Sequence, residues 1–176
     1  MVRGRDDRRP CDSTVSGFSA ERFRDVAGRF ASGVTVITGV DDDGPVGFTC
    51  QSFHALSLDP PMVVFAVAHT STSWPRIRKS GRCCVNVLAD TQEAVARTFA
   101  MSGIDKFASQ PWTPAEDGNP ILEGVLAWFS CTIAGIHPGG DHEVVTADVH
   151  SLDAADQEPL VFHRGRYSGI VDLGDT

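Results

Sequence analysis

The segments of this chain that have strand-like patterns are joined by connections that are mostly too short to contain a helix. A parallel sheet needs a crossover of a dozen or more residues between neighbouring strands, usually built from a helix. Short connections therefore favour antiparallel strands, and many such strands favour closure into a barrel, because closure removes exposed edges. We predict a mainly β fold with a few short flanking helices.

Several segments have the alternation or the apolar content of strands. Val34, Val36 and Thr38 alternate with their neighbours, and Asp41-Asp42-Asp43-Gly44 then predicts a hairpin turn. The run Met62 to Val67 is continuously apolar, which is typical of a strand buried on both faces, so we place it at the centre of the sheet. The predicted strands cover residues 34–39, 46–53, 62–67, 82–88, 121–136, 143–152 and 160–170.

The first predicted helix begins at Ser19, a residue type that caps helix N-termini, and is stopped by Gly33. Phe23, Val26, Ala27 and Phe30 follow helical spacing along one face, so we expect this face to pack inward.

Two more short helices are predicted. One covers residues 74–80, with Ser73 as its N-cap and Pro75 in its first turn, and the other starts at Asp90 with Glu93 three residues later. The stretch 102–120 mixes proline, glycine and polar residues and is the longest irregular segment, which makes it a candidate functional loop.

Length and charge limit the classes of protein to be considered. The 176 residues suit one domain, which we place at 18–172, after a flexible arm at 1–17 that is rich in charge and poor in large apolar groups. The net charge of −8 disfavours binding to nucleic acid. The longest apolar run, Met62 to Ala68, is too short to span a bilayer, and the charged N-terminus is unlike a signal peptide, so we expect a cytoplasmic protein.

The cysteines do not have the spacing of a metal or disulfide centre. There are five, an odd number, and none stands in a C-x-x-C pair, which suits a reducing compartment. Cys83 and Cys84 point to opposite faces of a predicted strand and are expected to be small core residues. We predict no metal site.

Three segments are candidates for chemistry, and each has a plainer interpretation. Small and polar residues at 47–53 offer backbone groups to a flat heteroaromatic ligand, or form a bulged edge strand. The hydroxyls at 70–73 precede a helix and suit a phosphate, with Arg78, Lys79, Arg82 and Lys106 near enough to assist, or simply cap the helix. His142 follows a Gly-Gly-Asp turn that presents it at a barrel rim, or it is an ordinary surface histidine.

Five motifs in order resemble the flavin reductase-like family, which has the FMN-binding split-barrel fold and includes the reductase components of two-component flavin monooxygenases. They are the stretch 30–38 (FASGVTVIT), 57–63 (SLDPPMV), 85–88 (VNVL), 140–142 (GDH) and 165–167 (GRY). The resemblance runs from about residue 18 to residue 170 and implies an antiparallel split β-barrel with Greek-key connections.

Two positions depart from the family pattern. The usual Thr-Ala-Asn-Ser flavin loop reads Thr49-Cys50-Gln51-Ser52, and Ala147 replaces a glycine expected after the Gly-Asp-His strand. Flavin binding tolerates both changes if backbone groups make most of the contacts.

The resemblance implies an NAD(P)H:flavin oxidoreductase that reduces FAD or FMN, takes hydride from NADH or NADPH, forms a homodimer and supplies a partner monooxygenase. It implies that His142 orients the nicotinamide and that Tyr167 lies near the same pocket. The residues implied to lie beside the isoalloxazine are Thr49, Cys50, Gln51 and Ser52. Those implied to hold the phosphate side are Ser71, Thr72, Ser73, Lys106 and Phe107, and Arg82 is a further candidate there.

Two other readings of the same fold stay open. One is a non-catalytic flavin- or haem-binding split-barrel protein, because fold does not fix function. The other is an oxidase of the pyridoxamine-phosphate type with tightly bound FMN, which is expected to carry a richer basic cluster than this chain has. The Gly140-Asp141-His142 turn favours the reductase, since a pure binder needs no residue facing a nicotinamide.

Overall fold

The computed structural model describes residues 17–170 and confirms a mainly β, antiparallel architecture. One sheet of seven strands has the order β3-β2-β6-β9-β10-β5-β4, and every pairing in it is antiparallel. Its strands are β2 (Thr35–Asp41), β3 (Gly44–Cys50), β4 (His54–Leu58), β5 (Pro61–Ala68), β6 (Arg82–Val87), β9 (Ala127–Gly139) and β10 (His142–Ala154).

Two small sheets complete the β-structure of the described residues. One joins β1 (Ser32–Gly33), β11 (Val161–His163) and β12 (Arg166–Ser168), and the other joins β7 (Trp112–Pro114) to β8 (Pro120–Leu122). The helices are α1 (Ala20–Ala27), α2 (Trp74–Ser80), the short 3-10 turn η1 (Asp90–Gln92) and α3 (Glu93–Ala100). None of the helices within residues 17–170 has the length and apolar character to cross a bilayer.

The seven-stranded sheet is split, because its two edge strands β3 and β4 pair with different neighbours and not with each other. They are nonetheless consecutive in the chain, so residues 51–53 must pass from one edge to the other. Ser52 bridges the gap there: its hydroxyl donates to the Ala66 carbonyl at 3.0 Å and accepts from the Ala66 N–H at 2.8 Å. Since His54 pairs with Val64, Ser52 occupies the next position opposite Ala66, and its side chain completes the ladder.

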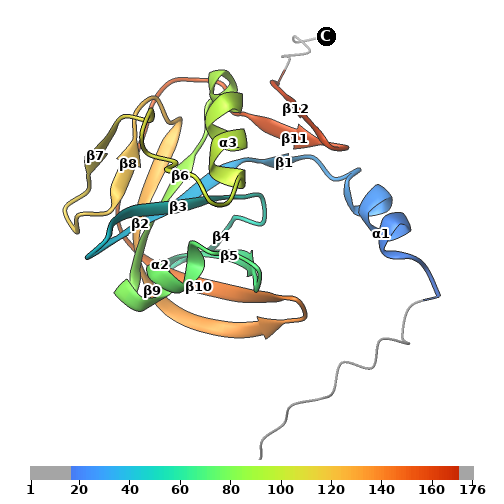
Figure 1. Ribbon diagram of the computed structural model, residues 1–176, viewed down its shortest axis with the longest axis horizontal. Helices are drawn as coiled ribbons and strands as arrows, with labels where there is room; N and C mark the ends of the chain where they lie inside the picture. The colour runs from blue at the N-terminus through green and yellow to red at the C-terminus, as the bar shows by residue number, and fades with distance from the viewer. Residues whose placement is uncertain (1–16, 171–176) are drawn as a thin grey trace, which may run out of the picture.

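The core lies on both faces of the curved sheet. One cluster of buried side chains, among them Phe65, Val85 and Val145, fills the inside. A second cluster lies under α3, where Phe99 and Leu122 are buried. Cys83 and Cys84 are fully buried in adjacent positions of β6, which confirms that they serve as small core residues. Figure 1 shows α3 lying across the strands, with the β11–β12 hairpin close to its upper end.

The expectation that the first helix packs inward is wrong. Ser19 does cap α1, accepting from the Arg22 N–H at 3.1 Å, but the helix ends at Gly28 and has no buried residue. Phe23 remains 59% exposed and Phe30 71% exposed. Figure 1 shows α1 standing to one side of the β-structure, and within residues 17–170 no element buries its apolar face.

The central position predicted for residues 62–67 is also wrong. These residues form most of β5, which lies next to the edge strand β4, while β9 occupies the middle of the sheet. Val63, Phe65 and Val67 point into the core, but the alternate residues are only half-buried. A continuous apolar run is compatible with two arrangements of a strand. Both faces can be buried in the core, or one face can be buried while the other lines a cavity.

Candidate functional site

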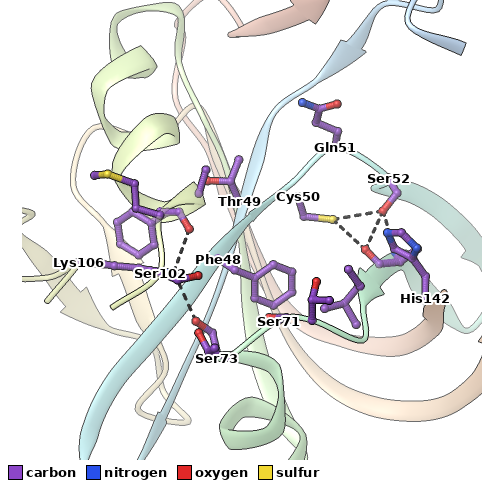
Figure 2. A pocket seen from close by; sticks show the side chains of 18 of the residues that line it. Phe48, Thr49, Cys50, Gln51, Ser52, Ser71, Ser73, Ser102, Lys106 and His142 are labelled. Atoms are coloured by element: carbon purple, nitrogen blue, oxygen red, sulfur yellow. Dashed lines mark hydrogen bonds between the residues drawn. The ribbon is translucent and has the colours of Figure 1, made fainter. Parts of the chain in front are cut away.

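A cavity of about 500 Å3 opens where the end of β3, the loop after β5, the end of α3 and the start of β10 meet. Its volume lies within the range of about 300–1,000 Å3 that is typical of small-molecule sites. Figure 2 shows Ser73 and Lys106 on one side of this cavity and His142 on the other. It is lined by Phe48, Thr49, Cys50, Gln51, Ser52, Ala66, Val67, Ala68, Thr70, Ser71, Thr72, Ser73, Phe99, Ala100, Met101, Ser102, Lys106, His142, Phe162 and Tyr167.

The β3 wall offers backbone more than side chains. The Thr49 hydroxyl donates to the Ala96 carbonyl at 2.6 Å, so it is used to hold α3. The Cys50 thiol is buried, lies 3.3 Å from the Ser52 hydroxyl, and has its pKa raised by burial. Gln51 is exposed, and in Figure 2 its amide extends away from the other labelled side chains. The departures from the family loop at Cys50 and Gln51 therefore leave the backbone facing the cavity.

Lys106 joins three segments at the opposite end of the cavity. Its ammonium donates to the Gly47 carbonyl at 2.9 Å and the Phe99 carbonyl at 3.0 Å, with a longer contact of 3.4 Å to the Ser73 hydroxyl. Burial lowers the pKa of this lysine. A partly desolvated cation whose third contact is weak can exchange that contact for an anionic ligand.

The two serines of the hydroxyl-rich loop have different roles. Ser73 precedes α2 but does not cap it with its side chain, because its hydroxyl is buried and donates to the Gly47 carbonyl at 2.8 Å. Ser71 accepts from the Trp74 N–H at 3.2 Å, which leaves its own hydrogen to donate into the cavity. The expected capping by Ser73 is thus performed by Ser71.

Thr70 and Thr72 are exposed at the same rim. The loop that carries them is fixed at its start, where the Ser71 N–H donates to the Ala68 carbonyl at 3.0 Å.

His142 begins β10 directly opposite Ala68 of β5, and its imidazole reaches the cavity. Its Nδ1 lies 2.6 Å from the Asp141 carboxylate, and this contact lowers the pKa of Asp141. The Asp141 carbonyl accepts from the His69 N–H at 3.0 Å, so the turn before His142 is tied to the loop that carries Ser71. A carboxylate on Nδ1 orients the ring and leaves Nε2 for a ligand.

Two carboxylates fix α2 on the sheet and thereby fix the loop in front of it. Glu143 accepts from the Trp74 indole at 2.5 Å and from Arg78 at 2.8 Å. Asp41 accepts two hydrogen bonds from the Arg76 guanidinium, from Nε to Oδ2 at 2.8 Å and from Nη2 to Oδ1 at 2.5 Å. The hydrogen bond from Arg76 lowers the pKa of Asp41 to about 2.

Tyr167 closes the cavity from the β11–β12 hairpin. It is half-buried, packs edge-on against Phe162 with ring centroids 5.0 Å apart, and has its pKa raised by burial. The Arg97 guanidinium lies 4.9 Å from the centre of its ring. The sequence-based placement of Tyr167 near the pocket agrees with this geometry.

Arg82 and Phe107 are not brought into the lining. Arg82 starts β6 with an exposed side chain away from the cavity. Phe107 is turned into the second core cluster, where its ring meets Phe99 at 5.0 Å and Trp112 at 6.3 Å. Its neighbour Lys106 is the member of that loop that reaches the site.

Other lining residues were not predicted because no motif marks them. Ala66 belongs to the run 62–67 that we predicted to be buried on both faces, and Ala68 follows it; their small side chains leave room above β5. Met101 and Ser102 follow α3 and lie on the rim. Within residues 17–170, no three His, Cys, Asp or Glu side chains converge as a metal site would require.

The residues present fit a flavin. The gap above Ala66 and Ala68, with Phe48 beside it, is floored by strand backbone, which suits a flat ring. Hydroxyls and the Lys106 ammonium at one end suit a phosphate. The imidazole of His142 lines the other end, where a second ring stacked on the flavin would lie.

The chain belongs to the flavin reductase-like family: residues 27–170 match the model of the flavin reductase-like domain. It is 53% identical over 151 residues to the flavin-dependent monooxygenase reductase subunit HsaB of Mycobacterium tuberculosis, an alignment that covers 84% of this chain and 81% of that protein. A flavin reductase of Pseudomonas putida is 39% identical, with 90% of this chain and 94% of the relative covered.

Solved structures agree with this assignment. A crystal structure of a nitrilotriacetate monooxygenase component B homologue from Mycobacterium thermoresistibile has a TM-score of 0.85 and 47% identity, and 89% of each chain is covered. The NADH:FAD oxidoreductase SgcE6 of Streptomyces globisporus, solved with NAD and FAD fragments, has a TM-score of 0.84 and 32% identity, covering 88% of this chain and 94% of that one.

Proposed function

We propose that this chain is an NAD(P)H:flavin oxidoreductase that reduces FAD or FMN and supplies the reduced flavin to a partner monooxygenase. The observation that carries the proposal is the polarity of the cavity, which has the Ser71 hydroxyl and the Lys106 ammonium at one end and His142 at the other. The M. tuberculosis relative bears the name of a monooxygenase reductase subunit, which supports the same role.

The residues of β3 and β5 that line the cavity would hold the flavin ring, and the loop that carries Ser71 would hold its phosphate. Backbone groups of residues 49–52 contact the isoalloxazine, because the side chains of Thr49 and Cys50 are bonded elsewhere. Ser71, Thr70 and Thr72 would donate hydroxyl hydrogens to the phosphate, and Lys106, whose contact with Ser73 is long, would supply a charge-assisted hydrogen bond. Ser73 serves this end indirectly by holding Gly47.

Bound flavin supplies the hydride acceptor, so the chain needs no catalytic acid for the transfer itself. The task of the protein is to hold the nicotinamide ring against the flavin at near-contact distance. His142 performs this orientation with an imidazole fixed by Asp141, and Tyr167 and Phe162 limit the space on the remaining side. NADH and NADPH are both accommodated by this assignment.

The rim of the site suits a flavin that exchanges. Thr70 and Thr72 are exposed at the opening, so this chain would not enclose the flavin on that side. A reduced flavin held by one short row of hydroxyls and one lysine leaves readily, as delivery to a separate monooxygenase requires.

We also propose the homodimer expected from the sequence. Phe23 and Val26 on α1 and Phe30 just after it have exposed apolar side chains, and Leu58 on the edge strand β4 is 94% exposed. A hollow between α1 and the rim is lined by Phe23, Phe30 and Phe162 together with Gln51 and Ser52, so a second copy seated there completes the open side of the site. The cytoplasmic location stays a prediction.

The test is anaerobic turnover of flavin-stripped protein with excess NADH and a large molar excess of FMN, FAD or riboflavin. We expect NADH consumption only when flavin is added, with many flavins reduced per chain. An enzyme that turns over its substrate only with one retained FMN would be an oxidase of the bound-flavin type. A protein that binds flavin without consuming NADH or NADPH would be a non-catalytic binder. Either result would contradict the proposal.

A further inference from the structure

The hairpin that carries Tyr167 has a basic tip that the proposed flavin and nicotinamide contacts do not use. His163, Arg164 and Arg166 lie at the turn between β11 and β12, and all three side chains are exposed. Neither arginine has an ion pair or side-chain hydrogen bond among the described residues, whereas Arg76, Arg78 and Arg97 each bind a carboxylate. The tip is therefore a pair of uncompensated guanidinium groups on a chain with a net charge of −8.

The backbone of the turn does not favour arginine. Arg164 has φ of +51° and Gly165 has φ of +78°, so both central residues of the two-residue turn are left-handed, as in a type I′ hairpin. Asn-Gly is the sequence that such a turn prefers, and Arg164 is the one non-glycine residue with positive φ within residues 17–170. A side chain kept at a strained position points to a role for that side chain.

The tip adjoins the cavity. His163, Arg164, Arg166, Tyr167 and Ser168 line a hollow of about 600 Å3, and Tyr167 also lines the main cavity. Phe162, opposite Tyr167 in the hairpin, is the second residue of this hairpin in the main cavity. The hairpin is held in place where the Arg164 N–H donates to the Gly28 carbonyl at 2.9 Å. Tyr167 therefore lies between the main cavity and the hollow at the basic tip.

We infer that this basic hairpin tip, residues 163–166, binds the diphosphate of a dinucleotide substrate. Guanidinium forks match phosphate oxygens in geometry and charge. NADH, NADPH and FAD are all anions that the overall charge of the chain repels, so a local positive group in the hollow next to the cavity assists their binding. The inference rests on the proposed function, and NAD(P)H is the favoured source, because the flavin phosphate is assigned to Ser71 and Lys106.

The decisive variant is Arg164→Asn, since it separates binding from folding. Asparagine relieves the strain of the left-handed turn, so we expect the melting temperature to stay the same or rise by about 1–3 °C. The Kd for ADP, measured by calorimetry as a probe that contains only the adenosine and the diphosphate, should rise about 3- to 10-fold, and more for Arg164→Asn with Arg166→Gln. The loss should shrink at high salt. Lys79→Gln is the matched control and should leave ADP binding unchanged, because the structure places this exposed cation of α2 in the lining of neither the main cavity nor the hollow at the tip.

The kinetic arms distinguish the two sources of the diphosphate. A KM that rises for NADH and NADPH, but not for FAD or FMN, assigns the tip to the pyridine dinucleotide, and a KM that rises for FAD alone assigns it to FAD. Unchanged ADP binding in the double variant would overturn the inference, as would an equal rise for FAD and FMN, which has no diphosphate. Because calorimetry needs no turnover, arginine-dependent ADP binding by a protein that reduces no flavin would leave the tip assigned and contradict only the proposed function.

Discussion

The two ends of the cavity differ in how their polar groups are used. At the phosphate end, Ser73 and Lys106 both donate to the Gly47 carbonyl, and Lys106 also donates to the Phe99 carbonyl of α3, so this end is built into the structure of the chain. At the nicotinamide end, Asp141 is the one hydrogen-bond partner of the His142 side chain within residues 17–170, and the Asp141 carboxylate is 94% exposed. Substitutions at the first end therefore change stability and binding together, whereas substitutions at the second should change binding alone.

The largest effect is expected at Gly47. A Cβ added there would lie 2.9 Å from Cε1 of Phe99 and 3.0 Å from the Ile37 carbonyl oxygen, so the strand and α3 must move apart. We expect Gly47→Ala to lower the free energy of unfolding by about 1–3 kcal/mol, and to weaken flavin binding because the Gly47 carbonyl holds Ser73 and Lys106. Denaturant unfolding measures the change. Gly33→Ala is the control, since no atom lies within 4 Å of its Cβ position; equal losses in both variants would show that the close packing of Gly47 is unimportant.

A smaller effect is expected at Lys106. Lys106→Met keeps the apolar stem but removes the donor to the Phe99 and Gly47 carbonyls. We expect the free energy of unfolding to fall by about 1–2 kcal/mol and the Kd for FMN to rise more than the Kd for riboflavin. Fluorescence titration of both flavins gives the ratio. An unchanged ratio, with lower stability, would mean that Lys106 is a structural tie and not a phosphate ligand.

The smallest effect concerns the anchor of α2 that is remote from His142. The pKa of Asp41, ordinarily 3.8, is lowered to about 2 by Arg76. A lowered carboxyl pKa contributes stability that is fully present above pH 3.8 and is lost as the pH falls towards 2. Asp41→Asn should therefore flatten the acid limb of the stability curve between these values and leave the KM for NADH unchanged. If the variant lost stability between pH 3.8 and pH 2 as steeply as the wild type, the ion pair between Asp41 and Arg76 would not be the cause of that loss.

Local signals in the sequence predicted where turns and helices begin better than they predicted which surfaces those elements pack against. The Asp41–Gly44 turn and the Ser19 cap are set by a few adjacent residues, and both are present. The outward face of α1 and the place of β5 beside an edge strand depend on which surface comes to lie opposite, which no local pattern encodes.

The same limit applies to the site. The sequence predicts the hydroxyls at 71–73 as one group of phosphate ligands. Only the fold shows that the Ser73 hydroxyl donates its hydrogen to the Gly47 carbonyl, whereas the Ser71 hydroxyl accepts from Trp74 and can still donate to a ligand. Arg82 has the same charge as Lys106 and was predicted to have the same role, but its position at the start of β6 places it outside the cavity lining.

The most direct test of the account is a crossed comparison of Ser71→Ala and His142→Ala in steady-state kinetics, with FMN, riboflavin and NADH varied in turn. Ser71→Ala removes a charge-assisted hydrogen bond worth about 1.5–3 kcal/mol, so the KM for FMN should rise roughly tenfold or more while the constants for riboflavin and NADH stay the same. His142→Ala should raise the KM for NADH and leave both flavins and the melting temperature unchanged. If both variants raised all three constants by the same factor, the cavity would have no separate phosphate and nicotinamide ends, and the account would be contradicted.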